Sequence, residues 1–371
     1  MSISISRARF AIIVLISFAG VAVMSGCASQ PEQAIEEVPL MVWPKPPEQA
    51  RIQYIGELKS FDKIRGAQKK SLRDRLLGAE SESGLTLSKP YGVHSDAAGR
   101  VFVADIGMGA LVMFDAENEK VEIWGTSGQG QLKQVLGVTS DSAGRIYVSD
   151  GFNQRIVVFD AEGEYVLAMG GKKYLNRPAG IVVNDVLDRV YVVDARNHQL
   201  VVFDRAGNFI ETMGERGPEP GNYNYPTNIA IDADGKLYVA DSMNFRIQVL
   251  EPDGTVVNTI GTVGDQRGQF ARLKGVGVDT DGHIYAVDAS FNNFQIFDRD
   301  GNLLLVVGNS GRGPGGFYLP AGVHVDAKNR ILVADQYNQR IQIFQYLGEP
   351  ENSEIESPAA INESGDDDPG L

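Results

Sequence analysis

The feature that most constrains this chain is a segment of eleven residues that returns several times. The segments DGFNQRIVVFD, DSMNFRIQVLE and DQYNQRIQIFQ are near copies of one another. Alignment on their first aspartate gives six copies, at intervals of 45, 44, 47, 47 and 47 residues. The aligned residues are Asp105, Asp150, Asp194, Asp241, Asp288 and Asp335. A period of this length is typical of arrays built from one supersecondary unit.

Each repeat contains four short apolar segments separated by turns. In the second repeat these are GVTSD, RIYVSD, RIVVFD and YVLAMG, with Gly-containing turns between them. Short strands joined by Gly, Asp and Asn turns predict an antiparallel meander. The third strands are apolar at successive positions, so both faces of each sheet must be buried. We therefore predict an all-β fold, a six-bladed β-propeller of four-stranded antiparallel blades.

The two ends of the repeat array indicate how the ring closes. The sixth repeat stops after its third strand, RIQIFQYL, and an unmatched β-type segment, ARIQYIGELKS, precedes the first repeat at 50–60. We expect this N-terminal strand to complete the last blade.

The repeats resemble a known family. The patterns D-x-x-N-x-R-I-x-V-F-D, G-x-F/Y-x-x-P-x-G-I and G-x-I/L-Y-V-A-D are similar to those of NHL-repeat six-bladed propellers, over about 260 residues from Leu87 to Gly348. The segment WPKPPEQARIQYIGELKS, followed by a short basic insert, resembles the bacterial secreted lipoprotein branch of that family. The resemblance implies the fold and leaves the activity open, because such folds host many functions.

The N-terminus is predicted to be an export signal. Two arginines precede the apolar run from Phe10 to Met24, which spans about 22 Å as a helix and is short for a membrane crossing. Met24-Ser25-Gly26-Cys27 resembles the lipobox of bacterial lipoproteins, although Met24 replaces the usual Leu. We expect lipidation at Cys27 and, since Ala28 is not Asp, an outer-membrane lipoprotein on the periplasmic side or the cell surface. The alternative is an ordinary cleaved signal with an incidental cysteine.

These observations divide the chain into segments. We predict a lipoprotein signal peptide (1–26), a tether (27–49), the propeller (50–348) with a basic insert at about 59–86, and an acidic disordered tail (349–371). In the insert, Ser71 is expected to cap a short basic helix, either packed on the propeller flank through its leucines or touching anionic head groups or a partner.

The net charge of −14 comes largely from the tail. The tail has eight acidic residues and no base, whereas the body from Arg51 to Gly348 has 31 Lys and Arg against 36 Asp and Glu, a net charge of −5. This near balance gives no indication of a broadly basic surface for nucleic acid.

One face of the ring is predicted to carry a binding site. In a four-stranded meander, the loops after the second and fourth strands open on the same face, and here they are rich in aromatic side chains. The candidates for this binding face are Tyr91, Phe152, Arg155, Tyr225, Met243, Phe245, Arg246, Lys274, Tyr318, Tyr337 and Arg340. The aromatic residues Tyr223, Phe270 and Phe317 are expected to be wedged between blades instead. The Asp-x-x-Asn-x-Arg element is expected to be structural, with an Asp–Arg pair between strands and Asn in a left-handed turn.

Two histidines are the only candidates for a metal site. His94 and His324 occupy equivalent positions in blades that become neighbours on closure. Peptide-amidating lyases of NHL type hold zinc with three histidines, and catalytic zinc normally takes three protein ligands, so packed or hydrogen-bonded histidines are expected here. No oxygen-rich set of the kind used by calcium-dependent lactonase propellers is found. No catalytic residue and no cofactor are therefore predicted, with zinc or calcium as the alternative.

Together these features predict a binding or scaffold protein of the bacterial envelope. We expect its loop face to bind a protein, peptide or polymer, its lipid to attach it to the membrane, and no interaction with nucleic acid. The oligomeric state is left open. The alternative is a metal-dependent hydrolase or lyase that acts in the central channel.

Overall fold

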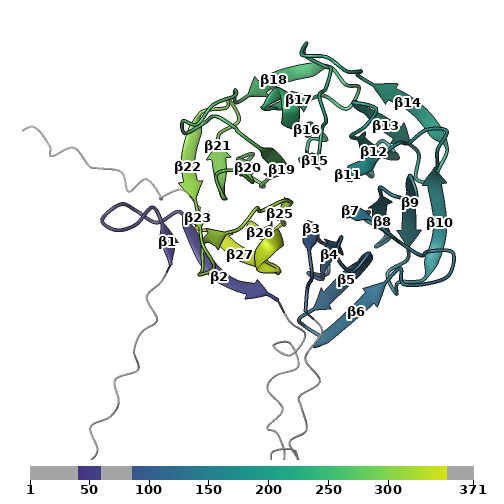
Figure 1. The fold of residues 1–371 in the computed structure, drawn as a ribbon, viewed down its shortest axis with the longest axis horizontal. Coiled ribbons are helices and arrows are strands. Elements are labelled where there is room, and N and C mark those ends of the chain that lie inside the picture. The colour runs from purple at the N-terminus through teal and green to yellow at the C-terminus, as the bar shows by residue number, and fades with distance from the viewer. Residues whose placement is uncertain (1–40, 60–85, 349–371) are drawn as a thin grey trace, which may run out of the picture. The chain divides into compact units, whose positions relative to one another are not determined.

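A computed structural model describes residues 41–59 and 86–348, which belong to one compact unit. Six antiparallel sheets are arranged as blades around a central channel, as predicted (Figure 1). Within the described ranges, no helix is both long and apolar enough to cross a membrane. The predicted signal peptide, the lipidation site at Cys27, the helix capped by Ser71 and the acidic tail all lie outside the described residues.

In each of the first three blades, the four strands follow one another in sequence from the channel to the rim, as predicted. Blade one consists of β3 (Pro90–Ser95), β4 (Val101–Asp105), β5 (Ala110–Asp115) and β6 (Lys120–Trp124). Blade two consists of β7 (Val135–Ser140), β8 (Ile146–Asp150), β9 (Arg155–Phe159) and β10 (Tyr165–Gly170). Blade three consists of β11 (Pro178–Asn184), β12 (Arg189–Asp194), β13 (Gln199–Phe203) and β14 (Phe209–Met213).

The last three blades repeat this order with small additions. Blade four consists of β15 (Asn228–Ile231), β16 (Leu237–Asp241), β17 (Arg246–Leu250) and β18 (Val256–Ile260). Blade five consists of β19 (Leu273–Val278), β20 (Ile284–Asp288), β21 (Asn293–Phe297) and β22 (Leu303–Val307). Blade six begins with β25 (Val323–Val325), β26 (Arg330–Asp335) and β27 (Arg340–Tyr346). Single 3-10 turns, η2 (Ser242–Asn244) and η3 (Gln336–Asn338), and the short parallel pair β23 (Asn309–Ser310) and β24 (Gly316–Phe317) lie in connecting segments.

The ring is closed by the N-terminal strand, which confirms the prediction. Strand β2 (Ile52–Leu58) pairs antiparallel with β27 and takes the fourth place in blade six (Figure 1). A further strand, β1 (Val42–Trp43), pairs with β2 and makes this sheet five-stranded. Strand β1 lies within residues 27–49, which were predicted to form a tether.

Burial explains why the inner strands are apolar at successive positions. Every residue of β4, β8 and β16 is buried, because the neighbouring blades cover both faces of these strands. The outermost strand β18 alternates between partly buried and exposed positions, since only one of its faces meets a neighbour. The blades approach one another closely near the start of the first strands, where a Cβ at Gly322 would lie 2.5 Å from the carbonyl oxygen of Tyr91.

Three aromatic side chains fill the spaces between blades, as predicted. Tyr223, Phe270 and Phe317 are fully buried. Phe317, for example, packs with Tyr285 of blade five and Phe344 of blade six in one apolar cluster. These residues therefore belong to the core and offer no surface to a partner.

The repeated aspartates hold the loops that enter the blades. The carboxylate of Asp150 accepts hydrogen bonds from the backbone amides of Lys133 and Gln134, both 3.1 Å, and from the side chain of Asn153, 2.6 Å. The residue in the left-handed conformation is Gln154 (φ 57°), not Asn153 as expected, because the Asn153 amide is committed to the aspartate. The left-handed residue of this turn was therefore predicted one position too early in the sequence.

The expected Asp–Arg pair forms in only some of the blades. The pair is present in blade four, between Arg246 and Asp241 at 2.9 Å, and in blade six, between Arg340 and Asp335 at 2.8 Å. In blade two, Arg155 instead donates to the carbonyl oxygens of Gln129 and Gln131 in the preceding loop, at 3.1 and 2.7 Å.

Candidate functional site

The loops that follow the second and fourth strands share one side of the ring, which we call the loop face. Backbone hydrogen bonds join the two kinds of loop, for example from Met243 to Asn224 at 2.9 Å and from Tyr337 to Tyr318 at 3.1 Å. The turns after the first and third strands lie at the opposite ends of the strands and form the turn face. Loops from six blades thus make a continuous surface around the channel mouth.

Five of the candidate binding residues stand out from this surface. Phe152 is 64% exposed, and Tyr225, Met243, Tyr318 and Tyr337 are each about half exposed. The rings of Tyr318 and Tyr337 lie against each other, with centroids 5.4 Å apart. We call these five residues the apolar set; large apolar side chains exposed together on one face are a common mark of a binding surface.

The other candidates are less available. Tyr91 and Phe245 are partly buried and pack against core clusters, and Lys274 is partly buried. Arg155 and Arg246 donate to carbonyl oxygens of the preceding loops. Those side chains hold the loops in place rather than extending from them.

Arg340 offers no free donor to a partner, since it is buried and its guanidinium is shared within the blade. It donates to Asp335 and Glu57, both at 2.8 Å, and to the carbonyl oxygens of Gly313 and Gly316. The sequence placed it on the binding face because its repeat position is that of Arg155. The strand β2 covers it.

His198 was not assigned a role from the sequence, yet it orders part of the loop face. Its Nδ1 accepts a hydrogen bond from the backbone amide of Tyr225 at 3.0 Å, and its ring lies 4.4 Å from the Tyr225 ring. Burial, together with the charge of Arg216, lowers the pKa of His198. A ring nitrogen must be unprotonated to accept a hydrogen bond. The sequence signal for this role of His198 was a histidine at the repeat position that adopts the left-handed conformation (φ 57°).

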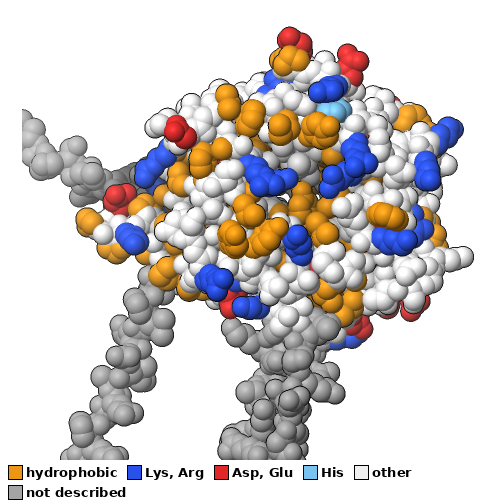
Figure 2. Space-filling view, viewed as in Figure 1, with side chains coloured by type: hydrophobic (Ala, Val, Ile, Leu, Met, Phe, Trp, Pro, Cys, Tyr) orange, Lys and Arg blue, Asp and Glu red, His pale blue; other side chains and the backbone are white. Residues whose placement is uncertain are grey.

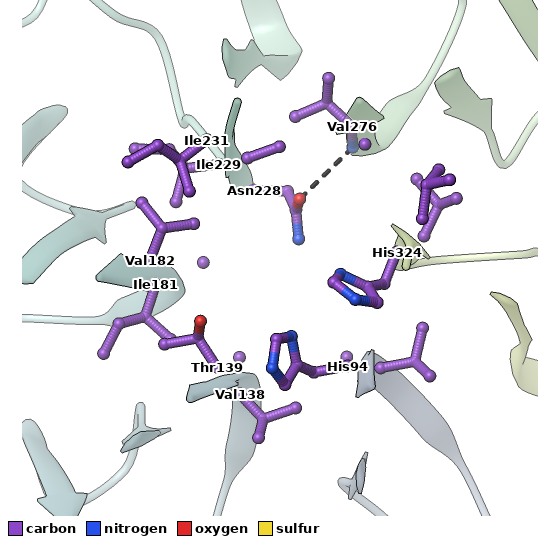
Figure 3. A pocket seen from close by; sticks show the side chains of 18 of the residues that line it. His94, Val138, Thr139, Ile181, Val182, Asn228, Ile229, Ile231, Val276 and His324 are labelled. Carbon is purple, nitrogen blue, oxygen red and sulfur yellow. Dashed lines mark hydrogen bonds between the residues drawn. The ribbon is translucent and has the colours of Figure 1, made fainter. Parts of the chain in front are cut away.

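The central channel is narrow, and most of the residues that line it are valines, isoleucines and glycines. It is lined by the first strand of each blade, and its cavity has a volume of about 100 Å³ (Figure 3). Pockets that enclose small organic ligands usually measure about 300–1,000 Å³, so this channel has room for only a few water molecules. The polar groups at its wall include His94, Thr139, Asn228 and His324 (Figure 3).

The two predicted histidines do meet in the channel. Their ring centroids are 4.4 Å apart, at an interplanar angle of 56° (Figure 3). Nε2 of His94 is 2.8 Å from the hydroxyl of Ser140, while Nε2 of His324 is buried and has no hydrogen-bond partner among the described residues. Burial and the adjacent His324 ring hold the pKa of His94 well below its usual range, and burial lowers that of His324 to about 4.

Neutral imidazoles can bind a metal ion, but this pair lacks further ligands. Among the residues that the structure describes, no group of three or more His, Cys, Asp or Glu side chains is placed to hold a metal. Catalytic zinc needs about three protein ligands, and calcium needs six to eight oxygens. The described residues therefore do not fit a catalytic zinc or calcium centre.

Comparison with known families agrees with this architecture. Residues 179–249 match a family described as a 6-bladed beta-propeller, and residues 317–344 match the NHL repeat. Among curated proteins, none matches the chain significantly.

Solved structures with similar folds have diverse functions. They include virginiamycin B lyase from Staphylococcus aureus (12% identity, TM-score 0.51, covering 70% of this chain and 95% of the lyase). A gluconolactonase from Xanthomonas campestris has 16% identity and a TM-score of 0.55, covering 70% of this chain and 86% of the enzyme. An auxiliary nutrient binding protein from Bacteroides thetaiotaomicron has 14% identity and a TM-score of 0.55, covering 70% of this chain and 69% of that protein. At these identities the likeness concerns the fold alone. The chain is a six-bladed β-propeller, and its last blade contains a segment, residues 317–344, that matches the NHL repeat.

Proposed function

We propose that this chain is a binding or scaffold protein of the bacterial envelope, which uses its loop face to hold a protein, peptide or polymer partner. The observation that carries the proposal is the exposure of the apolar set, Phe152, Tyr225, Met243, Tyr318 and Tyr337, on one face. The rigid blades present these side chains from loops that are fixed by buried aspartates, so little conformational entropy is lost on binding. Propellers of similar fold include a nutrient binding protein, which is consistent with such a role.

Site-specific crosslinking in living cells tests this proposal. A photoreactive amino acid is placed at Phe152 or Tyr337 on the loop face, and at Val186, which is 93% exposed on the turn face, as the matched control. We expect discrete crosslinked species from the two loop-face positions and none from Val186. The same species from Val186, or none from the loop face, would contradict the proposal.

The location in the envelope is part of the proposal and rests on the N-terminal sequence. The apolar run and the Met24-Ser25-Gly26-Cys27 motif support lipidation at Cys27 and anchoring in the outer membrane. Metabolic labelling with radioactive palmitate tests this. We expect the label in the natural chain and none in Cys27→Ser, and a Cys27→Ser chain that is labelled equally well would rule out lipidation at this residue.

A metal-dependent hydrolase or lyase in the channel is the second candidate. One observation favours it, namely the pair of neutral imidazoles formed by His94 and His324, in which Nε2 of His324 has no hydrogen-bond partner within residues 41–59 and 86–348. Propellers of similar fold include a lyase and a gluconolactonase. The narrow cavity and the lack of a third ligand among the described residues favour the binding role. Metal analysis of protein purified without chelator separates the two: one bound zinc or calcium per chain, lost in His94→Ala/His324→Ala, would support the enzyme.

A further inference from the structure

The two faces of the ring differ strongly in charge, which the overall composition hides. The connecting loops of the loop face carry many bases: Lys89, Lys133, Lys172, Lys173, Arg177, Arg196, Arg216, Arg267, Arg272 and Arg312. Among the described residues of the same loops, the acidic side chains are Glu215, Glu219 and Asp265. Figure 2 shows a face of this kind, with Lys and Arg side chains spread around the ring among hydrophobic ones and few acidic side chains.

The bases of the two faces are also used differently. On the turn face, Arg100, Arg145 and Arg330 each pair with an aspartate four residues away, at 2.7 Å. The loop-face bases named above form no ion pair with any residue in the described ranges. The six blade aspartates lie beneath the loop face, but they are buried and bonded to backbone amides, so they add no accessible negative charge to that of Glu215, Glu219 and Asp265.

Around the channel mouth, the loop face presents residues from the same position of each repeat. In each blade, the residues whose backbone amides bind the blade aspartate stand at the channel mouth. Four blades place a base there, namely Lys89, Lys133, Arg177 and Arg272. In blade four the first such residue is Asn224, followed by the exposed Tyr225, and in blade six it is Tyr318. Blades one, two, three and five thus place a cation at this position, whereas blades four and six place a tyrosine at it or next to it.

Two of these bases stand directly beside members of the apolar set. Nζ of Lys89 lies 4.9 Å from the centre of the Tyr337 ring, and Nζ of Lys133 lies 4.8 Å from that of Phe152. Such contacts hold a cation and an apolar surface side by side. A ligand that binds here must offer anionic groups close to apolar ones.

We infer that the loop face binds an acidic peptide segment of a partner protein, one that carries apolar side chains among its Asp and Glu residues. The inference rests on the proposed function and names the chemistry of the partner. Carboxylates satisfy the unpaired bases, while apolar side chains pack on the apolar set. Met243 favours a peptide over an acidic polysaccharide, because a flexible thioether adapts to irregular side chains, whereas sugars stack on flat rings.

Selection from a random dodecapeptide library displayed on phage tests the inference, with the full purified chain as target. We expect the selected peptides to be enriched in Asp and Glu together with aromatic or aliphatic residues. One selected peptide is then measured by fluorescence anisotropy at physiological salt. Lys133→Gln/Arg272→Gln is expected to weaken its binding roughly tenfold, because both bases are exposed and neither side chain is used by the fold.

The control is Lys236→Gln/Lys328→Gln, which removes two positive charges from the turn face and is expected to change affinity less than twofold. Peptides without acidic enrichment, no selected peptide at all, or equal effects of the two double variants would overturn the inference. So would tighter, Lys133- and Arg272-dependent binding of an oligothymidine, of polygalacturonate or of phosphatidylglycerol vesicles. If crosslinks from Phe152 persist while acidic peptides fail, the binding function stands and only the partner chemistry is wrong.

Discussion

The buried guanidinium of Arg340 should make ring closure measurable. Arg340 and Arg246 hold equivalent repeat positions, and each donates to its blade aspartate and to two loop carbonyl oxygens. Arg340 alone also reaches Glu57 of strand β2, at 2.8 Å. Removing one partner of a buried ion pair costs about 3–5 kcal/mol, since the remaining charge stays buried. We expect this loss of unfolding free energy for Arg340→Met.

The matched variant Arg246→Met isolates the contribution of the closing strand. A hydrogen bond to a charged group is worth about 1.5–3 kcal/mol, so Arg340→Met should cost that much more than Arg246→Met. Urea denaturation measures both losses. In a domain of this size, each kcal/mol shifts Tm by about 2 °C, which gives a drop of roughly 6–10 °C for Arg340→Met. Equal losses in the two variants would refute the idea that Arg340 stabilises the closed ring.

The same variant should show a defined pH dependence. Burial raises the pKa of Asp335, and Arg340 is among the groups that oppose this rise. Without Arg340, the folded protein binds a proton that the unfolded chain releases, so unfolding free energy falls as pH rises from the unfolded to the folded pKa of Asp335. The deficit of Arg340→Met should therefore be smaller near pH 4 than near pH 8. A deficit independent of pH would contradict this assignment.

Three further predictions concern the core and the channel. Phe317→Ala should cost about 3–5 kcal/mol because it empties a fully buried site between blades, whereas Tyr318→Ala, on the exposed side, should cost less than about 0.5 kcal/mol in urea denaturation. Gly322→Ala should cost about 1–3 kcal/mol, because its Cβ would meet the Tyr91 carbonyl, whereas Gly313→Ala, with no atom within 4 Å, should be near neutral. His94 and His324 should be seen as neutral imidazoles by NMR at pH 6. The pKa values of both histidines in the folded protein lie below the unfolded value of about 6.5, so the unfolding free energy should fall as pH drops below 6.5. This fall should be less steep in His324→Gln. A charged imidazole at pH 6 would contradict the burial argument.

The fold could be predicted from the sequence because its information is local and repeated. Each blade shows the same turns and the same aspartate, so six weak signals add up, and the unmatched strand at 50–60 had one place to go. The extra strand β1 carries no repeat and was not expected. The left-handed residue was misplaced by one position, because Asn is the residue type that favours this conformation, whereas here the Asn153 side chain bonds to Asp150 and the following Gln154 is left-handed.

The site was harder to predict because exposure depends on neighbours that no motif records. Arg340 and Arg155 share a motif position, but only Arg340 is bonded to Glu57 of β2, so the same letter is a buried anchor in one blade and a partly buried side chain in another. The basic loop face was hidden in a body whose charges nearly balance. Lys133 and Arg272 are exposed at one end of the strands, and acidic turns such as that of Asp232 and Asp234 lie at the other. Summed charge cannot reveal such a separation.

Hydroxyl-radical footprinting tests the central claim, that the loop face is covered by a partner, most directly. The purified chain and the same chain in intact cells are oxidised briefly, and the oxidation of Met243, Tyr318 and Tyr337 is quantified by mass spectrometry. Phe209 and Leu187, which are exposed outside the loop face, serve as references. We predict that the loop-face residues are protected several-fold in cells while the references are unchanged. Equal oxidation of Met243, Tyr318 and Tyr337 in the two samples would contradict the claim.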